Sequence, residues 1–400
     1  MPGSMPPDAR SLAEEGVVIP PTIVGRHGVV DEAAVLAAMA NGPWPSRAPD
    51  SNLADIRAAA AALDAGAHAM VQMAAELGTA TLLGAMQQLM QRSAQHVRRL
   101  AAALAPSGVR HAATTLDDGT PLAVTIEPRA DGTLRVLVDA PVLHPRSLNA
   151  PLAVTHSAIL YVLRTLAADA AGHPLDDHVA PLNEGSLLPV EIRVTPGFLN
   201  PFSAPDAATT NPAHLPPVFA GNTEASQRLV DALLLAVGAA ANSQGTMNNL
   251  VFGNHRYSVY ETMGGGAGAT RHAHGVSAVH VHMSNTRLTD PETLELRHPV
   301  RLERMQLRAG SGGAGQWHGG AGMVRRIRML EPVRVNFIGQ HRVVPPAGLD
   351  GGLPGAVGLQ RILRADGTVE EQPGMFAADL RAGDAVEIHT PGGGGCGAPA

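Results

Sequence analysis

Leu122-Ala-Val-Thr-Ile126 and Leu134-Arg-Val-Leu-Val138 flank the turn residues Asp131-Gly132, and this stretch decides the fold class. Apolar residues alternate along both runs, which is the pattern of strands with one buried face. An Asp-Gly pair between two such runs is typical of a hairpin turn. The sequence therefore predicts an antiparallel hairpin over residues 122–138.

A helical pattern precedes the hairpin. A region rich in Ala, Leu, Met and Gln runs from Asn52 to about Leu104, and its apolar spacing favours helix over strand. Gly66 and Gly78 are the points at which such a helix would break. The sequence therefore predicts one or two long helices ahead of the hairpin.

Downstream of the hairpin, helices give way to strands. Helical patterns cover residues 151–168 and 223 to about 241, whereas residues 181–194 have an extended pattern. Beyond Val276, short apolar runs alternate with Gly and Pro, which is typical of strands and turns. The prediction is an α+β fold, with a helical region early and a strand-rich, glycine-punctuated region late.

The length of the chain predicts several lobes. A single hydrophobic core stops growing well below 400 residues. We expect the chain to divide into an extended wrapping segment (1–51), a helical region (52–106), a mixed α/β core that carries the site loops (107–275) and a β-rich region (276–400).

Composition excludes several classes of protein. The most apolar stretch, Leu229 to Ala241, is too short to span a membrane. Met1-Pro-Gly-Ser4 has neither the basic start nor the apolar run of a signal peptide, so we expect a cytoplasmic protein. The net charge is −6 without a basic block, which argues against nucleic acid or a membrane as a partner. Cys396 is the single cysteine, which excludes a disulfide framework and a multi-cysteine zinc site.

All 29 Lys and Arg positions of the sequence are occupied by arginine, so lysine is absent. The chain therefore lacks the lysine of a P-loop, a Schiff-base lysine, an anchor for pyridoxal phosphate and a Ser-x-x-Lys nucleophile pair. If ATP takes part in the function, we expect another polypeptide to bind it.

Two stretches match the spacing of the dinucleotide fingerprint, Gly310-Ser-Gly-Gly-Ala-Gly315 and Gly392-Gly-Gly-Gly-Cys-Gly397. That fingerprint works where a strand leads into the start of a helix. Neither stretch leads into a helical pattern, so a Rossmann fold is rejected. These glycines are predicted to form turns.

Histidines cluster at His272, His274, His280 and His282. In a strand, residues two apart share a face, so His280 and His282 could direct two imidazoles to one point. A catalytic metal usually takes a third protein ligand, and no HxxxE or HExxH pattern lies nearby. Histidines that hydrogen-bond in a polar cleft are therefore favoured over metal ligands.

The densest unusual chemistry lies in Asn248-Asn249, in Tyr260-Glu-Thr262 and in the run Gly264-Gly-Gly-Ala-Gly268. Amides, a phenol and a carboxylate beside a glycine run could line a pocket in which backbone amides face an oxyanion. The alternative is a buried polar loop with a structural role.

Several longer motifs resemble the hydantoinase B/5-oxoprolinase family in unbroken order. They are Gly221-Asn-Thr-Glu-Ala-Ser-Gln-Arg228, Ser243-Gln-Gly-Thr-Met-Asn-Asn249, Tyr260-Glu-Thr-Met-Gly-Gly-Gly-Ala-Gly268, His280-Val-His-Met-Ser-Asn-Thr-Arg287, Leu307-Arg-Ala-Gly-Ser-Gly-Gly-Ala-Gly315 and Thr390-Pro-Gly-Gly-Gly-Gly395. Pro2-Gly-Ser-Met-Pro-Pro-Asp8, Asn52-Leu-Ala-Asp-Ile-Arg57 and Leu148-Asn-Ala-Pro151 match as well. The resemblance covers essentially the whole chain.

This resemblance implies ATP-coupled work on cyclic amides. In the family, a hydantoinase A-type partner phosphorylates the substrate and the B-type part completes the ring-opening hydrolysis. The expected partners are an A-type ATPase subunit, in a hetero-oligomer, and a small cyclic amide such as 5-oxoproline or a hydantoin. One alternative is a non-catalytic remnant that serves as a scaffold for the A-type subunit. Another is a subunit of an acetone or acetophenone carboxylase-like complex.

The predicted site follows the motifs of the resemblance. The candidate catalytic residues are Glu261, Tyr260, His280 and His282, and the candidate substrate-binding residues are Asn222, Gln227, Arg228, Asn248, Asn249, Gly264, Gly265 and Gly266. Arg228 is expected to steady an anionic group. Glu261 is expected to transfer a proton.

The resemblance also implies a metal centre outside these residues. In the family, the phrase Pro-Gly-Ser-Met-Pro follows a segment with a His-x-x-Asp and a further His that look like metal ligands. Here the phrase begins at Pro2. We therefore expect no cofactor bound by this chain, ATP through the partner, and a divalent metal only in that segment.

Overall fold

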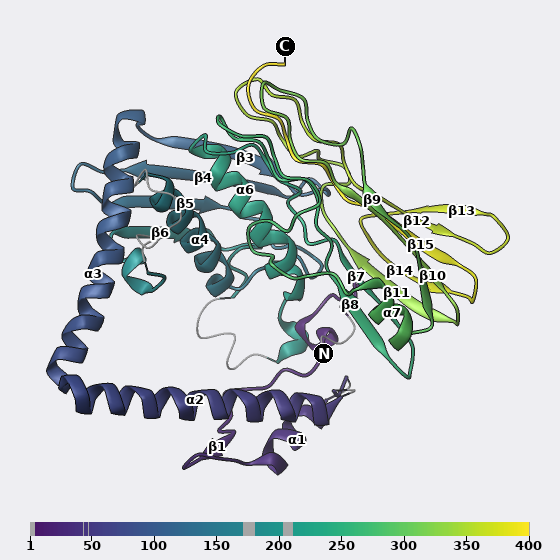
Figure 1. Ribbon diagram of the computed structural model, residues 1–400, viewed down its shortest axis with the longest axis horizontal. Coiled ribbons are helices and arrows are strands. Elements are labelled where there is room, and N and C mark those ends of the chain that lie inside the picture. Colours follow the sequence, from purple (N-terminus) through teal and green to yellow (C-terminus); the bar gives the residue numbers. More distant parts are fainter. Residues whose placement is uncertain (1–4, 43, 47, 171–180, 203–210, 400) are drawn as a thin grey trace.

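The computed structural model describes residues 5–42, 44–46, 48–170, 181–202 and 211–399 (Figure 1). Helices dominate the early part of the chain and strands the later part, so the predicted α+β fold is confirmed. Among the described residues, none of the helices combines the length and the apolar character that crossing a membrane requires.

The elements have the following bounds. The helices are α1 (Glu32–Ala40), α2 (Pro49–Leu77), α3 (Thr79–Leu104), α4 (Leu152–Ala170), α6 (Ser226–Ala236) and α7 (Pro291–Arg297). The strands are β1 (Gly25–Arg26), β2 (Val29–Val30), β3 (Arg110–Thr115), β4 (Pro121–Pro128), β5 (Leu134–Asp139), β6 (Val190–Val194), β7 (Asn249–Gly253), β8 (Ser258–Glu261), β9 (Val300–Leu307), β10 (Met323–Met329), β11 (Val333–Ile338), β12 (Leu359–Leu363), β13 (Val369–Gln372), β14 (Met375–Leu380) and β15 (Ala385–His389).

The predicted helical region is two long helices that meet at a corner. α2 runs through Gly66 without a break, whereas the chain turns at Gly78, which has a φ of +83°. That backbone conformation is accessible mainly to glycine. Figure 1 shows α3 running along one side of the molecule and α2 leaving it at a steep angle. Of the two predicted breaks, only Gly78 interrupts the helix.

The first hydrophobic core lies between the sheet β3-β4-β5-β6 and three helices, α3, α4 and α6. The predicted hairpin is the β4–β5 pair, in which Val124 faces Val138. β6 joins β5 in parallel. α6 lies on β3 and β4 and packs against α4. The apolar alternation seen in the sequence therefore buries one face of this sheet under helices.

The second hydrophobic core lies between two sheets, β14-β11-β7-β8 and β13-β12-β15-β10-β9. Phe252 and Phe337 of the sheet β14-β11-β7-β8 share this core with Ile327 and Ile388 of the other sheet. β7 pairs with β11, so this sheet includes residues on both sides of the predicted boundary at residue 275. The strands that follow Val276 thus complete a sandwich that begins at β7.

The amino-terminal segment packs beside residues 218–219, which precede α6. Met5 and Ala9 are buried. The carboxylate of Glu15 accepts hydrogen bonds from the backbone N–H groups of Val218 (2.9 Å) and Phe219 (3.1 Å). Burial raises the pKa of Glu15 to about 7.

Extended glycine-rich segments form a bundle at one end of the sandwich, seen as closely spaced traces near the carboxyl end in Figure 1. We call this the glycine bundle; its segments are residues 264–269, 275–279, 311–322, 347–356 and 391–397. Backbone hydrogen bonds run from segment to segment, from Gly313 N to Gly393 O (2.8 Å), Gly393 N to Gly320 O (2.9 Å) and Gly320 N to Ala267 O (2.9 Å).

Close approach between backbones explains most of these glycines. A Cβ on Gly319 or Gly393 would stand 2.0 Å from a backbone carbonyl oxygen of another segment, and a Cβ on Gly312 would stand 2.0 Å from that of Gly319. Gly310 and Gly397 do have positive φ angles, as turn glycines do. At the other positions of the stretches 310–315 and 392–397, the prediction of turns is wrong. The spacing of glycines cannot distinguish a turn from a tight contact.

Gly393→Ala should destabilise the protein strongly, because its Cβ would stand 2.0 Å from the carbonyl oxygen of Ala267 and the backbone would have to move. We expect a loss of about 3 kcal/mol in the free energy of unfolding, measured by urea denaturation. Gly84→Ala is the control, since open space surrounds Gly84 within α3 and alanine favours helix by up to about 1 kcal/mol. Equal stability of the two variants would contradict the close-packing account.

Candidate functional site at the junction of the two cores

Polar side chains gather where α6 meets the loop before β7 and the loop after β11. We call this cluster the polar junction; it consists of Asp117, Glu224, Arg228, Asp231, Asn248, Asn249, His341 and Arg342. Asp117 and Arg342 are half-buried and the others are almost fully buried. Buried polar groups of this kind are stable only when they are hydrogen-bonded to one another.

A π-helical turn, Gly221–Ala225, places Glu224 at the start of α6. The sequence predicted one helix from residue 223 to about 241, but α6 itself ends at Ala236. Gly221 packs closely here, since its Cβ would stand 2.2 Å from the backbone oxygen of Asn149. Turns of the π type occur frequently at functional sites.

Glu224 connects three separate parts of the chain. Its Oε1 accepts hydrogen bonds from Asn249 Nδ2 (2.7 Å) and Met247 N (3.2 Å). Its Oε2 accepts a hydrogen bond from Gln340 N (3.0 Å). Asn249 in turn accepts a hydrogen bond from the hydroxyl of Tyr260 (2.8 Å). This buried carboxyl group therefore holds α6, β7 and the loop after β11 in one arrangement.

Asp117 ties the first sheet to the loop after β11. It lies in the turn between β3 and β4, and its carboxylate accepts hydrogen bonds from Arg342 N (2.7 Å) and Val344 N (2.9 Å). The side chain of Arg342 then donates to Asn248 Oδ1 (2.7 Å) and to Gln360 Oε1 (3.0 Å). The polar junction thus links the two hydrophobic cores.

The side chain of Arg228 is buried and bonds to groups in the interior. Its Nη2 donates to Thr115 O (2.7 Å) and Thr114 Oγ1 (3.0 Å), and its Nη1 lies 2.8 Å from His341 Nδ1. Burial lowers the pKa of His341 well below its ordinary value, and the charge of Arg228 lowers it further. His341 is therefore neutral at physiological pH.

Asp231 lies about one helical turn after Arg228. Its Oδ1 accepts hydrogen bonds from Ser243 N (2.9 Å) and from His282 Nε2 (2.9 Å). Its Oδ2 has no hydrogen-bond partner among the described residues, and neither does His341 Nε2. A Cβ on Gly245 would stand 2.7 Å from the first of these atoms and 2.6 Å from the second. Both polar atoms therefore face the same position, which is open because residue 245 is glycine.

Backbone strain is concentrated in this region. Asn248, His282 and His341 have positive φ angles of 49°, 55° and 57°. Each such conformation costs about 1–3 kcal/mol for a residue other than glycine, and such residues cluster at functional sites. The surrounding hydrogen bonds offset this cost.

Burial raises the pKa of Glu224 to about 8, against hydrogen bonds from Thr246 and Met247 that lower it. Burial also lowers the pKa of Arg342 to about 10. When Glu224 is protonated, two aspartates and two arginines remain in the junction with opposite charges. An ionised Glu224 adds an unbalanced negative charge to a buried site, which is unfavourable.

The structure brings several of the predicted site residues together. Arg228, Asn248 and Asn249 belong to the polar junction, and Tyr260 and His282 bond to it directly. Gln227 is buried beside them, and its Nε2 donates to Val281 O (3.3 Å). Asn222, by contrast, is exposed on the π turn.

Glu261 and His280, which were predicted site residues, lie outside the polar junction. Glu261 forms a buried ion pair with Arg325 (2.8 Å) inside the sandwich. His280 bonds to Ser284 Oγ (3.1 Å), and burial lowers its pKa. The expectation that His280 and His282 share a strand face is wrong, because residues 280–284 form a turn and the two imidazoles bond to different partners.

Gly264, Gly265 and Gly266 lie in the glycine bundle. The backbone N–H of Gly265 donates to Val279 O (3.1 Å), and that of Gly266 donates to Pro391 O (3.0 Å). Glycine is needed here because a Cβ would collide with neighbouring atoms at 2.1 Å and 2.0 Å. These two amides therefore do not face an open pocket, contrary to the expectation of an oxyanion site at this run.

Sequence reasoning missed five residues of the junction. They are Asp117, Glu224, Asp231, His341 and Arg342. Glu224 stands inside the quoted motif 221–228, and Asp231 follows Arg228 at helical spacing. Those two could have been found as charged residues on an apolar helix. Asp117, His341 and Arg342 lie in loops without any informative spacing.

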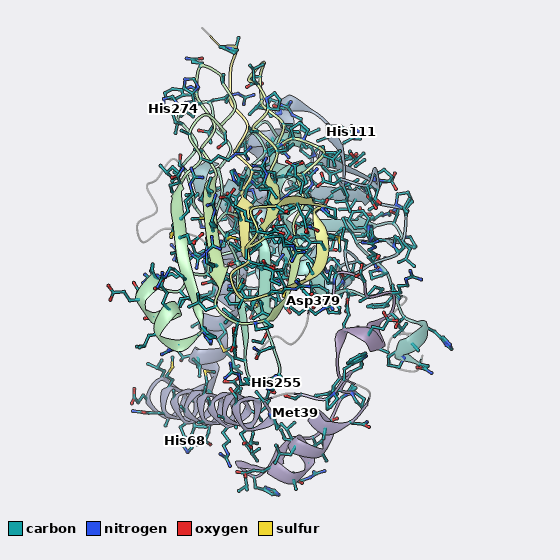
Figure 2. The ribbon with its side chains drawn as sticks, turned by 90° about the vertical axis from the view of Figure 1, so that its right-hand side faces the viewer. Met39, His68, His111, His255, His274 and Asp379 are labelled. Carbon is teal, nitrogen blue, oxygen red and sulfur yellow. The ribbon has the colours of Figure 1, made fainter. Side chains whose placement is uncertain are left out.

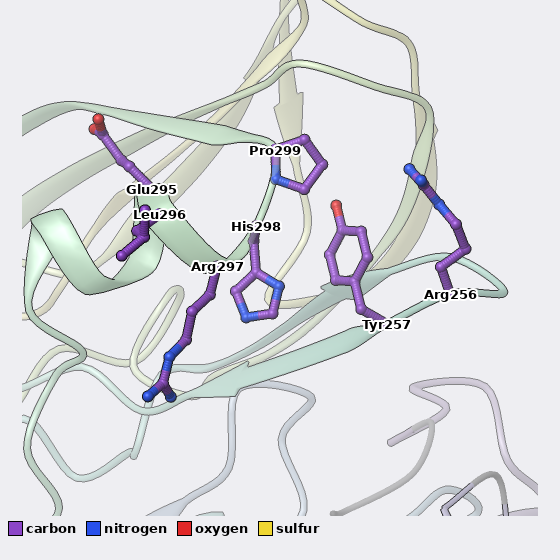
Figure 3. A pocket seen from close by; sticks show the side chains of 7 residues that line it. All are labelled: Arg256, Tyr257, Glu295, Leu296, Arg297, His298 and Pro299. Carbon is purple, nitrogen blue, oxygen red and sulfur yellow. The ribbon is translucent and has the colours of Figure 1, made fainter.

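A surface pocket of about 500 Å³ lies between the β7–β8 turn and α7 (Figure 3). Its lining residues are Arg256, Tyr257, Glu295, Leu296, Arg297, His298 and Pro299. The rings of Tyr257 and His298 lie 5.0 Å apart at its centre. The predicted site residues do not line this pocket.

Among the described residues, neither a three-ligand metal cluster nor, at residues 310–315, a phosphate-binding loop before a helix is found. Within the described ranges, there is no group of three or more His, Cys, Asp or Glu side chains placed to hold a metal ion. The glycine stretch 310–315 leads into the bundle and not into a helix, so it lacks the helix amino terminus that binds phosphate. We therefore derive no reaction step through either group.

The sequence match over almost the whole chain defines the class of this protein. The chain belongs to the hydantoinase B/oxoprolinase family, whose sequence model matches residues 1–399. The resemblance inferred from the motifs is thereby confirmed.

Two curated relatives illustrate the match. The chain is 35% identical to 5-oxoprolinase 1 of Arabidopsis thaliana, over 99% of this chain and 32% of that protein. It is 33% identical to the 5-oxoprolinase of Dictyostelium discoideum, over 99% of this chain and 30% of that protein. The chain thus spans about a third of the length of these relatives.

Solved structures share the fold. The ATP-dependent caprolactamase from Pseudomonas jessenii matches with a TM-score of 0.80 at 22% identity, over 100% of this chain and 69% of that one. A nucleotide-free acetone carboxylase structure matches with a TM-score of 0.80 at 16% identity, over 99% of this chain and 58% of that one. At such identities the likeness establishes the fold alone.

The raised pKa of Glu224 predicts a pH-dependent stability. In the window from 4.5, the ordinary value, to about 8, the folded protein holds this proton and the unfolded chain does not. The stabilisation is fully present below that window and is lost as the pH rises through about 8. Glu224→Gln should therefore change the free energy of unfolding by an amount that depends on pH.

Urea denaturation of both proteins at about pH 5 and about pH 9 measures this difference. Comparison with the wild type cancels the contribution of Glu15, whose pKa is raised as well. We expect the variant to be relatively more stable at the higher pH. A difference between the proteins that stays constant across pH would contradict the raised pKa.

Proposed function

We propose that this chain is the B-type part of an ATP-coupled hydrolase that opens the ring of cyclic amides. In this proposal an A-type polypeptide binds ATP and phosphorylates the substrate, and the present chain acts in the hydrolysis that follows. The two form a hetero-oligomer in the cytoplasm.

One observation carries the proposal: a single similarity covers 99% of the chain and reaches proteins named as 5-oxoprolinases. The absence of lysine from the chain supports a separate ATP-binding polypeptide. The relatives named as 5-oxoprolinases support a cyclic amide as the substrate, because 5-oxoproline is one. We propose a divalent metal, where the reaction uses one, outside the described residues.

The polar junction suggests roles for the residues of the proposed site. His282 is the candidate base, since the Asp231 carboxylate holds its Nε2 and orients the ring. Glu224, with a pKa near 8, is a better candidate for proton transfer than Glu261, which is paired with Arg325. Arg228 and Asn249 hold these groups in place.

Reconstitution with an A-type polypeptide from the same source tests this function. The purified chain alone should hydrolyse no ATP, whereas the mixture should open 5-oxoproline, hydantoin or caprolactam in an ATP-dependent reaction. Product formation by chromatography and phosphate release are the measurements. ATP hydrolysis that follows this chain through purification would contradict the proposal.

The same mixture separates the two alternatives. ATP-dependent carboxylation of acetone or acetophenone without ring opening would assign the chain to a carboxylase. Unchanged activity of the A-type polypeptide with and without this chain would leave a scaffold role. In a reaction that depends on the chain, Asp231→Asn and His282→Gln should each lower kcat by about a hundredfold or more.

A further inference from the structure

The helix α2 is exposed on almost every side. Of its 29 residues, from Pro49 to Leu77, Leu53 alone is buried. Figures 1 and 2 show α2 standing apart from the sheets, with His68 pointing away from the body of the molecule. Most helices in proteins are stabilised by packing of an apolar face against a neighbour, and isolated helices are marginal in water.

An apolar stripe with heptad spacing runs along α2. Ile56, Leu63, Met70 and Leu77 follow one another at seven-residue intervals, and Met73 lies between the last two. The exposed fractions of Leu63, Met70 and Leu77 are 76%, 41% and 53%. We call these five residues the α2 stripe. Such spacing is the pattern of a helix that packs lengthwise against another helix.

Small residues border the α2 stripe on both sides. The flanking heptad positions are occupied by Ala60, Ala62, Ala67, Ala69 and Ala74. Alanine at these positions lets a second helix approach closely. The flank that contains Ala62 and Ala69 also carries Asp55 near one end and Glu76 near the other. A helix that packs here meets carboxylates at both ends of the seam.

The apolar face of α3 also extends beyond what covers it. Val97 and Leu100 are buried against the first core. About two and three turns before Val97, the same helix presents Leu89 and Met86, which are 48% and 45% exposed. Exposed apolar side chains therefore occur on the adjoining half of α3 as well as on α2.

We propose that the α2 stripe is the docking site for an amphipathic helix of a partner polypeptide, with basic residues beside its apolar seam. The apolar seam would bury Leu63, Met70 and Leu77, and the basic flank would meet Asp55 and Glu76. The identity of this partner as the A-type polypeptide rests on the proposed function, whereas the docking surface itself does not.

Charge disfavours an antiparallel second copy of this chain as the occupant. In an antiparallel pair of α2 helices, flanking positions of one kind face each other, so Asp55 of one copy would face Glu76 of the other. Like charges placed opposite one another are destabilising. A partner with basic flanks turns the same carboxylates into attractive contacts. The 5-oxoprolinase relatives carry about two thirds of their length outside the part matched here, which is ample material for such a helix.

A synthetic helix tests the docking surface without any natural partner. The probe is a labelled peptide of about four heptads with Leu at the seam positions and Lys at the flanking ones. Lysine flanks also keep the peptide from pairing with itself. The control peptide carries Glu in place of Lys. Fluorescence anisotropy with the full chain measures binding, and the Lys peptide should bind at least about tenfold more tightly than the Glu peptide.

Two variants of the chain decide where the peptide binds. The double variant Leu63→Gln/Met70→Gln should weaken binding by about tenfold or more, because two apolar side chains leave the seam. Val71→Gln is the matched control, since Val71 is 70% exposed on the same helix but lies off the α2 stripe. It should change binding less than about twofold. Absent binding of the Lys peptide, or equal binding by both variants, would overturn the proposal.

Light scattering of the purified chain tests whether a second copy of the chain occupies the α2 stripe. A dimer that Leu63→Gln/Met70→Gln abolishes and Val71→Gln leaves intact would assign the α2 stripe to a second copy and overturn the proposal. An A-type polypeptide that binds the wild type and Val71→Gln but not the double variant would support it. Failure of any A-type polypeptide to bind the wild type counts against the proposed function, while the peptide titration still decides the docking surface.

Discussion

Backbone segments in the glycine bundle lie so close together that side chains are excluded, and the geometry of the junction depends on this constraint. The loop that leads into the junction is bonded to the bundle at Asn242, whose N–H donates to Ala347 O and whose carbonyl accepts from Gly394 N. Gly245 and Asn248 follow a few residues later in the same loop. The bundle therefore fixes the backbone from which the polar junction is built.

The polar junction joins the two hydrophobic cores by hydrogen bonds. Glu224 and Asp117 each bond to backbone N–H groups of the loop after β11, so a shift of either core breaks hydrogen bonds to a buried or half-buried carboxylate. Leaving such a group unsatisfied costs about 1–3 kcal/mol or more. This makes the relative position of α6 and the sandwich specific, and it holds His282 against Asp231.

The exposed arm of α2 and α3 contrasts with this tightly bonded body. One end of α3 is buried against the first core, while α2 carries an apolar stripe into solvent. These two features fit a model in which the two cores form a rigid polar site and the helices α2 and α3 form a surface for assembly. The α2 stripe and the polar junction lie on separate elements, so assembly and chemistry can be altered by different substitutions.

Local patterns in the sequence determined much of the fold. Alternation over 122–138 predicted the β4–β5 hairpin, and Gly78 marked the corner between α2 and α3. These predictions succeed because strand and helix periods and glycine conformation are properties of neighbouring residues. The family motifs likewise contain Arg228, Asn248 and Asn249, which the structure places in the polar junction.

Only the tertiary structure decided how distant residues pair. Glu224 bonds to Gln340 across 116 residues, and Arg228 meets His341 across 113. Glu261 stands beside Tyr260 in the sequence, yet it turns into the sandwich toward Arg325, because successive side chains of a strand point to opposite faces. Gly312 and Gly393 looked like turn residues, since spacing alone does not reveal another backbone atom 2.0 Å from the missing Cβ. Contacts of this kind depend on how whole segments pack, which no local period encodes.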